Sequence, residues 1–233
     1  MVLHRAFGPK RMRSGRFVVF AALLLAVAAG VPAHAAAERY DYRVIHPTYG
    51  DIGTYVNTID RVGDDTEVTT EMRIAVRFLG IVVYRQEARR IERWHGQQLV
   101  SFDGLTITNG DRLAVHGVAR NGAFVVTTPS GTVTGPADVH PSNPWSIMVL
   151  QSPVMMSTRT GKILPARVTG GEVEPVSLPG LNRNLHQYEI DTDKRQYVWT
   201  DDAGTPVAFE TREKGTPVDF VLSRREQLAD RSR

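Results

Sequence analysis

Apolar and polar residues alternate with a period of two over most of the chain, which predicts a protein built mainly from β-strands. The alternation is cleanest over residues 66–78, where Val68 and Met72 share one face and Glu67 and Arg73 share the other. One apolar and one polar face are typical of a half-buried strand. Shorter patterns of the same kind predict strands over residues 38–47, 54–59, 98–108, 113–119, 124–127, 154–156, 163–168, 173–176, 185–190, 197–199, 207–211 and 218–222.

Turn signals separate these segments at intervals of roughly ten residues, the spacing of an antiparallel meander rather than of βαβ units. Asn109-Gly110 and Asn121-Gly122 are strong hairpin signals, because both central residues of a type I′ turn need positive φ. No linker or internal repeat divides the chain. We therefore expect a single β domain over residues 36–233, folded as a strongly curved antiparallel sheet or open half-barrel.

The segment 81–94 is extended but has no face that is apolar along its whole length. Arg90, Glu92 and Trp94 fall on the same face. Either the strand runs past the core and its far end is solvated, or Arg90 and Glu92 line a polar concavity. A helix over residues 84–93 is disfavoured, because the apolar residues there form no helical stripe.

The alternation stops over residues 140–156, where two prolines bracket Trp145 and a Met-rich apolar run follows. Asn143 is a good N-cap and Pro144 suits the first helical position, so one short helical insert is expected near residues 143–151. Such a helix is too short to be stable alone. It must be held by packing Trp145 onto the sheet.

The two ends of the chain differ from the rest in composition. Five basic residues precede an uninterrupted run of apolar residues from Phe17 to Val31, and Ala33 and Ala35 then offer small residues at a cleavage site. This order predicts a cleaved signal peptide over residues 1–35, and hence a periplasmic or secreted protein. A membrane anchor is the alternative, but the run is shorter than the roughly 18 residues of a spanning helix. The polar C-terminal segment, residues 224–233, is expected to be frayed or weakly helical.

Charge and cysteine content restrict the possible partners. The predicted signal peptide holds five of the 28 basic residues and none of the 25 acidic ones, so the remaining chain carries 23 basic against 25 acidic residues, a net charge of −2. Nucleic-acid binding is therefore not expected, since it needs a basic surface. The chain contains no cysteine. Disulfides, a lipidated cysteine and sulfur-ligated zinc are thus excluded, and packing must hold the core.

The sequence predicts no catalytic residue, no metal ligands and no cofactor. It contains no G-x-S-x-G elbow, no S-x-x-K pair, no glycine-rich phosphate loop and no paired-histidine spacing for zinc. A metal held by His116 and His186 across strands is a weak alternative. Carboxylates that a hydrolase would need are available at Asp103, Glu172, Asp191, Asp201 and Asp202, but spacing alone cannot pair them.

Aromatic residues occur in nearly every predicted strand, and most of them are expected to form the core. Some of them, together with the methionines of the insert, alternatively line an apolar pocket beneath the helix. Methionine-rich walls suit adaptable binding of acyl chains and other irregular apolar ligands. The candidate ligand-binding residues are Trp145, Met148, Met155, Met156, Arg90, Tyr188 and Trp199.

Several short motifs carry a resemblance over nearly the whole predicted mature chain. They are Tyr42-Arg43-Val44, Asp51-Ile52-Gly53, Trp94-His95-Gly96-Gln97-Gln98-Leu99, Thr108-Asn109-Gly110, Ser142-Asn143-Pro144-Trp145, Thr160-Gly161-Lys162 and Trp199-Thr200-Asp201. With them the chain resembles a family of exported bacterial β proteins catalogued only as a domain of unknown function. A looser likeness is to periplasmic half-barrel lipoprotein carriers, in which a curved sheet encloses an apolar cavity. Both likenesses imply a location and an architecture, not a mechanism.

We therefore expect a non-enzymatic envelope protein that binds an apolar or amphipathic ligand, or a protein partner, in the concave face of its sheet. A hydrolase acting on envelope glycan or lipid through carboxylates inside the sheet is one alternative. A structural or assembly module is another, and a large exposed apolar patch would favour it.

Overall fold

The fold is dominated by one antiparallel sheet, seen in a computed structural model that describes residues 1–2, 34–213 and 215–229. Within those residues, thirteen strands pair in the order β12-β13-β14-β15-β16-β1-β2-β3-β4-β5-β6-β7-β8. The predicted signal peptide lies almost entirely outside the described residues, so its cleavage stays a prediction. No helix in the described part of the chain is long and apolar enough to cross a membrane.

The strands of this sheet have the following bounds. They are β1 (His34–His46), β2 (Gly50–Val62), β3 (Asp65–Phe78), β4 (Ile81–His95), β5 (Gln98–Thr108), β6 (Asp111–Arg120), β7 (Ala123–Thr128), β8 (Gly131–Pro136), β12 (Arg167–Leu178), β13 (Leu181–Asp191), β14 (Arg195–Thr200), β15 (Pro206–Glu213) and β16 (Thr216–Gln227).

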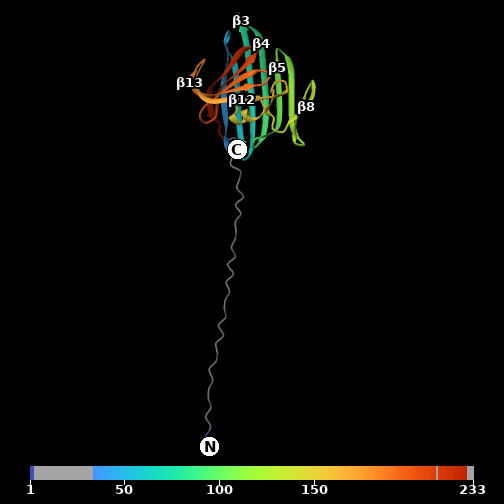
Figure 1. Cartoon of the computed structure of the whole chain (residues 1–233), viewed down its shortest axis with the longest axis vertical. Helices are drawn as coiled ribbons and strands as arrows, with labels where there is room; N and C mark the ends of the chain where they lie inside the picture. The colour runs from blue at the N-terminus through green and yellow to red at the C-terminus, as the bar shows by residue number, and fades with distance from the viewer. Residues whose placement is uncertain (3–33, 214, 230–233) are drawn as a thin grey trace. The chain divides into compact units, whose positions relative to one another are not determined.

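Two meanders join to make the sheet. Strands β1 to β8 follow one another, β12 to β16 do the same, and β16 pairs with β1 along Glu38–Ile45. Strands β8 and β12 remain as the two edges, so the sheet curves without closing (Figure 1). The curved antiparallel half-barrel predicted from the period-2 pattern is confirmed. The Asn-Gly turns also behave as expected, since Asn109 and Asn121 have φ of 50° and 53°.

The segment between β8 and β12 forms a small layer against the concave face of the sheet. It contains β9 (His140–Pro141), the 3₁₀ helix η1 (Ile147–Gln151), β10 (Val154–Met156) and β11 (Ile163–Pro165), with the three strands paired as β11-β10-β9. We call residues 137–166 the insert. Its contacts reach both meanders, because Gly161 lies against Val126 on β7 and Ile147 lies against Gly204 beyond β14.

The helix of the insert begins later than the sequence suggested. We expected it near residues 143–151 with Asn143 as N-cap, whereas it is a 3₁₀ helix over Ile147–Gln151 capped by Ser146. The Ser146 hydroxyl accepts a hydrogen bond from the amide of Met148 at 3.2 Å. Asn143 cannot cap a helix here, because its side chain is fully used in hydrogen bonds to the sheet.

The C-terminal segment also differs from its expected frayed or weakly helical form. Strand β16 continues to Gln227, and Arg225 pairs with Tyr40 on β1. Its guanidinium donates to the Glu38 carboxylate at 3.0 Å, and Arg61 from β2 donates to the same carboxylate at 3.0 Å. These ion pairs extend the sheet through a polar stretch that has no apolar pattern. Residues 230–233 lie outside the described part of the chain.

Trp145 anchors the insert to the sheet, as the sequence predicted. It is 7% exposed and packs edge-on against Trp94 of β4, with ring centroids 5.8 Å apart. Its indole N–H donates a hydrogen bond to the buried carboxylate of Glu92 at 3.0 Å. The side chain therefore contributes both apolar burial and a polar contact.

Replacing Trp145 with alanine should destabilise the fold by about 3–5 kcal/mol, the usual cost of truncating a buried aromatic residue. Chemical denaturation measures the loss. Trp145→Phe keeps most of the apolar volume and removes only the N–H donor, so its loss should be smaller. An unchanged melting temperature in Trp145→Ala, together with lost ligand binding, would mean that Trp145 binds a ligand instead of holding the insert.

Candidate functional site

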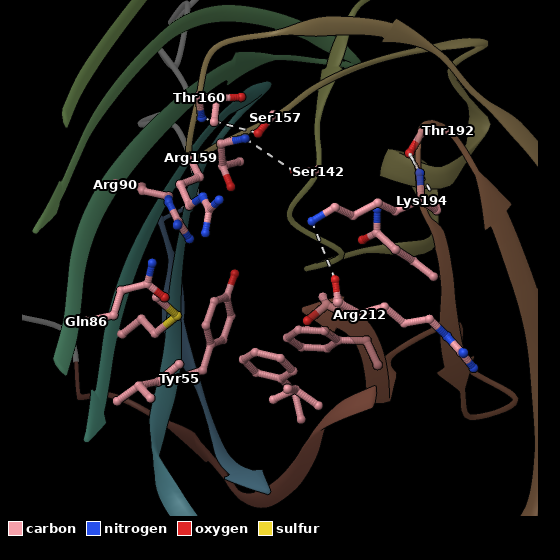
Figure 2. Close-up of a pocket in the computed structure, with 18 of the residues that line it drawn as sticks. Tyr55, Gln86, Arg90, Ser142, Ser157, Arg159, Thr160, Thr192, Lys194 and Arg212 are labelled. Atoms are coloured by element: carbon pink, nitrogen blue, oxygen red, sulfur yellow. Dashed lines mark hydrogen bonds between the residues drawn. The ribbon is translucent and has the colours of Figure 1, made fainter. Parts of the chain in front are cut away.

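A cavity of about 480 Å³ lies between the concave face of the sheet and the insert. Strands β2, β3 and β4 form one wall, β14, β15 and β16 contribute the other, and residues 155–164 of the insert cover it (Figure 2). Its size falls in the range of roughly 300–1,000 Å³ found for small-molecule sites. This is the candidate functional site.

The floor of the cavity is apolar, because the strands present alternate side chains to it. Ile52 comes from β2, Met72 and Ile74 come from β3, and Phe209 and Phe220 come from β15 and β16. The two phenylalanine rings stack with centroids 4.3 Å apart. All five side chains belong to the main hydrophobic core, so the floor is a rigid extension of that core.

The polar part of the lining is strongly basic. Arg90, Arg159, Lys162, Lys194 and Arg212 all line the cavity. Figure 2 shows the side chains of Arg90 and Arg159 close together and Lys194 reaching in from the opposite wall, while the Arg212 guanidinium points away. The lining contains a single acidic residue, Asp193, among the residues that the structure describes.

Arg90 is the basic residue with the least ordinary surroundings. It is only 5% exposed, and its Nε has no hydrogen-bond partner among the described residues. The guanidinium contacts the Tyr55 hydroxyl and lies near Glu92 and Arg159. Burial lowers the pKa of Arg90, because desolvation disfavours its charged form. A buried cation with an unused donor is a costly arrangement, and a bound anion would complete it.

Beneath Arg90 lies Glu92, a buried carboxylate with 0% exposure. Its Oε1 accepts from the Asn143 side-chain amide at 2.8 Å. Its Oε2 accepts from the indole N–H groups of Trp145 at 3.0 Å and Trp94 at 3.2 Å. Three donors therefore converge on one carboxylate, and two of them come from the insert.

Asn143 extends this network to two further strands. Its side-chain oxygen accepts from the Tyr55 hydroxyl at 2.6 Å and from the Asn57 amide at 3.3 Å. Its side-chain nitrogen also donates to the Thr70 hydroxyl at 3.0 Å, and that hydroxyl donates to Asn57 at 2.8 Å. We call Glu92, Asn143, Tyr55, Asn57, Thr70, Trp94 and Trp145 the buried network. It fixes the insert at the inner end of the cavity.

The two interpretations of residues 81–94 are resolved by this arrangement. The face that carries Gln86, Arg90 and Glu92 is buried, so these residues line the interior of the half-barrel and not a solvated strand end. Arg90 contacts the cavity and Glu92 lies in the network behind it. The polar residues of β4 therefore belong to the site.

The other candidate binding residues are spread over several places. Met155 lines the cavity together with Arg90, whereas Met156 is fully buried behind it. Tyr188 is half-buried against Gly171. Trp199 belongs to a separate apolar cluster, where its N–H donates to Gln187. Half-buried Met148 packs at the edge of the main core, and Trp145 lies in the buried network.

Sequence reasoning missed four of the five basic residues of the lining, Arg159, Lys162, Lys194 and Arg212. Arg159 lies in a turn after the Met-rich run, and Lys194 lies in the turn between β13 and β14. Both side chains are exposed and line the cavity. Only the tertiary fold brings them into one cavity with Arg90.

The carboxylates and histidines considered for catalysis or metal binding form two separate pairs and do not converge on one site. Asp103 of β5 pairs with His116 of the neighbouring strand β6 at 2.6 Å, and Asp202, in the turn after β14, pairs with His186 of β13 at 3.3 Å. Strands β5 and β13 are far apart in the sheet order. Asp201 accepts from backbone amides in its own turn. The described residues contain no group of three or more potential metal ligands.

Glu92 gives the site a pH dependence that can be measured. Burial raises the pKa of Glu92 to about 7 from its ordinary 4.5, although its hydrogen bonds and the charge of Arg90 oppose the shift. The folded state therefore binds the proton more tightly than the unfolded state. The stability contribution of the protonated carboxyl is complete below pH 4.5 and is lost as the pH rises through about 7.

We expect the free energy of unfolding to fall by an amount on the order of 3 kcal/mol across this pH range, relative to Glu92→Gln, which cannot titrate. Urea denaturation at a series of pH values measures it. Glu87→Gln is the matched control, because Glu87 lies on the outer face of the same strand. Equal pH dependence in the wild type and in Glu92→Gln would show that this pKa is not raised.

Comparisons with known proteins agree with this architecture. A crystal structure described as a beta-barrel-like protein of domain of unknown function DUF1849, from Brucella abortus, is similar with a TM-score of 0.62 over 82% of this chain and 98% of that chain. The identity is 8%, so the likeness concerns the fold alone. No curated protein matches the chain. A family model described as a domain of unknown function, DUF6134, matches residues 42–223. The chain therefore belongs to the DUF6134 family of proteins with a domain of unknown function.

Proposed function

We propose that this protein is a non-enzymatic binding protein of the bacterial envelope, and that its cavity holds an amphipathic ligand with an anionic head. The observation that carries the proposal is the polarity of the cavity. Its floor is apolar, and its polar lining is basic with the partly unpartnered Arg90 buried in it. The apolar part of the ligand would lie on the floor, and its anionic group would lie near Arg90, Arg159 and Lys194.

The volume of the cavity restricts the size of the ligand. With roughly 30 Å³ for each water-sized group, about 480 Å³ has room for about sixteen such groups. One acyl chain of ordinary length with a small head fits this space, whereas the two chains of a phospholipid do not. We infer a single-chain amphiphile such as a long-chain carboxylate.

The electrostatics support an anionic head over a neutral one. An unused guanidinium donor in a site of low solvent access makes charge-assisted hydrogen bonds of roughly 1.5–3 kcal/mol. Such bonds form in pairs between arginine and a carboxylate or phosphate group. Arg159 and Lys194 lie at the same cavity and add positive charge.

The proposed envelope location rests on the N-terminal sequence. A basic segment, an apolar run and a small-residue cleavage site follow one another over residues 1–35. A chain without cysteine needs no oxidising compartment for its fold, but it remains compatible with one. An export role also suits a protein that shields an acyl chain from water between two membranes.

Native mass spectrometry of the protein purified from its own periplasm tests the proposal directly. We expect a bound species with the mass of a single-chain acid. In addition, a fluorescent fatty acid should bind, and Arg90→Gln should weaken its binding by tenfold or more, the equivalent of one charge-assisted hydrogen bond. Arg159→Gln should weaken it less, because Arg159 is exposed.

Arg89→Gln is the matched control for Arg90→Gln. Arg89 is the preceding residue on β4 and is exposed on the outer face, so its variant should bind like the wild type. Melting curves of both variants separate lost binding from lost folding. The proposal fails if a fatty alcohol binds as tightly as the corresponding acid and Arg90→Gln has no effect on either.

A further inference from the structure

The tip of the β3–β4 hairpin exposes an unusual amount of apolar surface. Leu79 is 86% exposed, Ile81 70%, Phe78 58% and Val83 54%. By contrast, strands β5, β6, β8 and β12 each carry a single exposed valine, Val100, Val118, Val133 and Val173. Isolated apolar residues are normal on a surface, but a contiguous apolar patch marks an interaction site.

The turn itself is not the most stable choice for a hairpin. Leu79 and Gly80 connect the strands with φ of 50° and 81°. Two other hairpins of this chain have asparagine in the corresponding position, Asn109 and Asn121, with nearly the same φ. Asparagine tolerates this conformation, whereas a bulky residue such as leucine is strained in it. Leu79 is therefore unfavourable for the turn and unfavourable for solubility.

Positive charge flanks the apolar tip. Arg73 and Arg77 on β3, and Arg85 and Arg89 on β4, are all exposed. Glu87 lies opposite Arg73 and 3.9 Å from Arg85, and Glu71 lies opposite Arg89, so this part of the two strands carries two more arginines than glutamates. The tip thus combines apolar side chains with an excess of arginine, the combination that favours the surface of an anionic bilayer.

The tip also adjoins the cavity. Val76 and Tyr84 are cross-strand partners, and both line the cavity. The next pairs outward along the hairpin are Arg77 with Val82 and Phe78 with Ile81. The exposed apolar surface therefore begins where the lining of the cavity ends.

We propose that the β3–β4 hairpin tip, residues 77–85, docks onto the surface of an anionic lipid bilayer. The apolar side chains enter the interfacial region, and the flanking arginines contact acidic headgroups. This inference depends on exposure, turn geometry and charge at the tip, and it stands whether or not the cavity holds a ligand. If the cavity does bind an amphiphile, the same contact places the cavity next to the membrane.

A local fluorescence measurement tests the docking. The chain has no cysteine, so a label on Ile81→Cys is attached at one position only. We use the full chain with phosphatidylcholine vesicles, with and without phosphatidylglycerol. A blue shift of an environment-sensitive label is expected on the phosphatidylglycerol vesicles, and the shift should weaken as salt is added. The same label on Val173→Cys, an exposed valine of the edge strand β12, should not shift.

Two variants in the Ile81→Cys background separate the apolar and electrostatic contributions. Leu79→Asn should weaken vesicle binding by about tenfold, the equivalent of one buried leucine, while its melting temperature stays the same or rises because the turn becomes Asn-Gly. Arg77→Gln together with Arg85→Gln should weaken binding by about 25-fold, or fivefold for each arginine. Arg120→Gln, in the β6–β7 hairpin at the opposite end of the strands, is the control for charge.

The outcomes distinguish lipid from the other possible occupants. The proposal is overturned if the label at residue 81 does not respond to phosphatidylglycerol vesicles, or if the label at residue 173 responds equally. If the protein attached to the vesicles through its N-terminal segment alone, the label at residue 81 would not respond. A shift that depends on protein concentration without lipid would identify a second copy of the chain as the occupant, and would also overturn the proposal.

Discussion

The hydrogen bonds to the Glu92 carboxylate are the interaction on which the arrangement of this protein depends. A curved sheet with two free edges does not by itself determine what fills its concave face. The insert reaches that face through Asn143 and Trp145, and both donate to the same buried carboxylate. A buried charge without donors would cost several kcal/mol, so the insert and the strand stabilise each other only when they are joined. The network therefore fixes one position of the insert on the sheet, which apolar packing alone would specify less uniquely.

The cavity is a consequence of where that connection lies. Because the network holds Asn143 and Trp145 against Glu92, the rest of the insert extends over the concave face, and residues 155–164 cover a space there without filling it. The floor there keeps its apolar side chains, and Arg90 of β4 lies beside the space with a buried Nε that has no partner among the described residues. Glu92 compensates part of its charge, which makes a buried guanidinium tolerable without saturating it. Glu92, which holds the insert, and Arg90, the candidate binding residue, are therefore electrostatically coupled.

The sequence predicted the architecture much better than it predicted the site. Period-2 alternation and Asn-Gly turns are local signals, and they gave the antiparallel meander with most strand bounds close to those observed. The strand predicted over residues 185–190 begins earlier, at Leu181, because the two-residue turn Pro179-Gly180 suffices to connect β12 and β13. The role of Asn143 was also misjudged, since a helix cap and a buried amide look alike in a sequence. The difference lies in Tyr55, Thr70 and Glu92, which are distant along the chain.

The pattern of apolar and polar residues was hardest to interpret in β4, the strand that carries the proposed binding residue Arg90. Its first residues, Ile81 to Val83, are apolar and exposed; its middle lines a cavity; and its last residues form a buried polar network. Each environment selects a different residue type, so no single face of the strand is apolar throughout. An ordinary half-buried strand such as β3 has one environment on each face and therefore alternates regularly. The pattern of β4 is irregular because one strand has three roles, and the irregularity identifies the strand that carries the site.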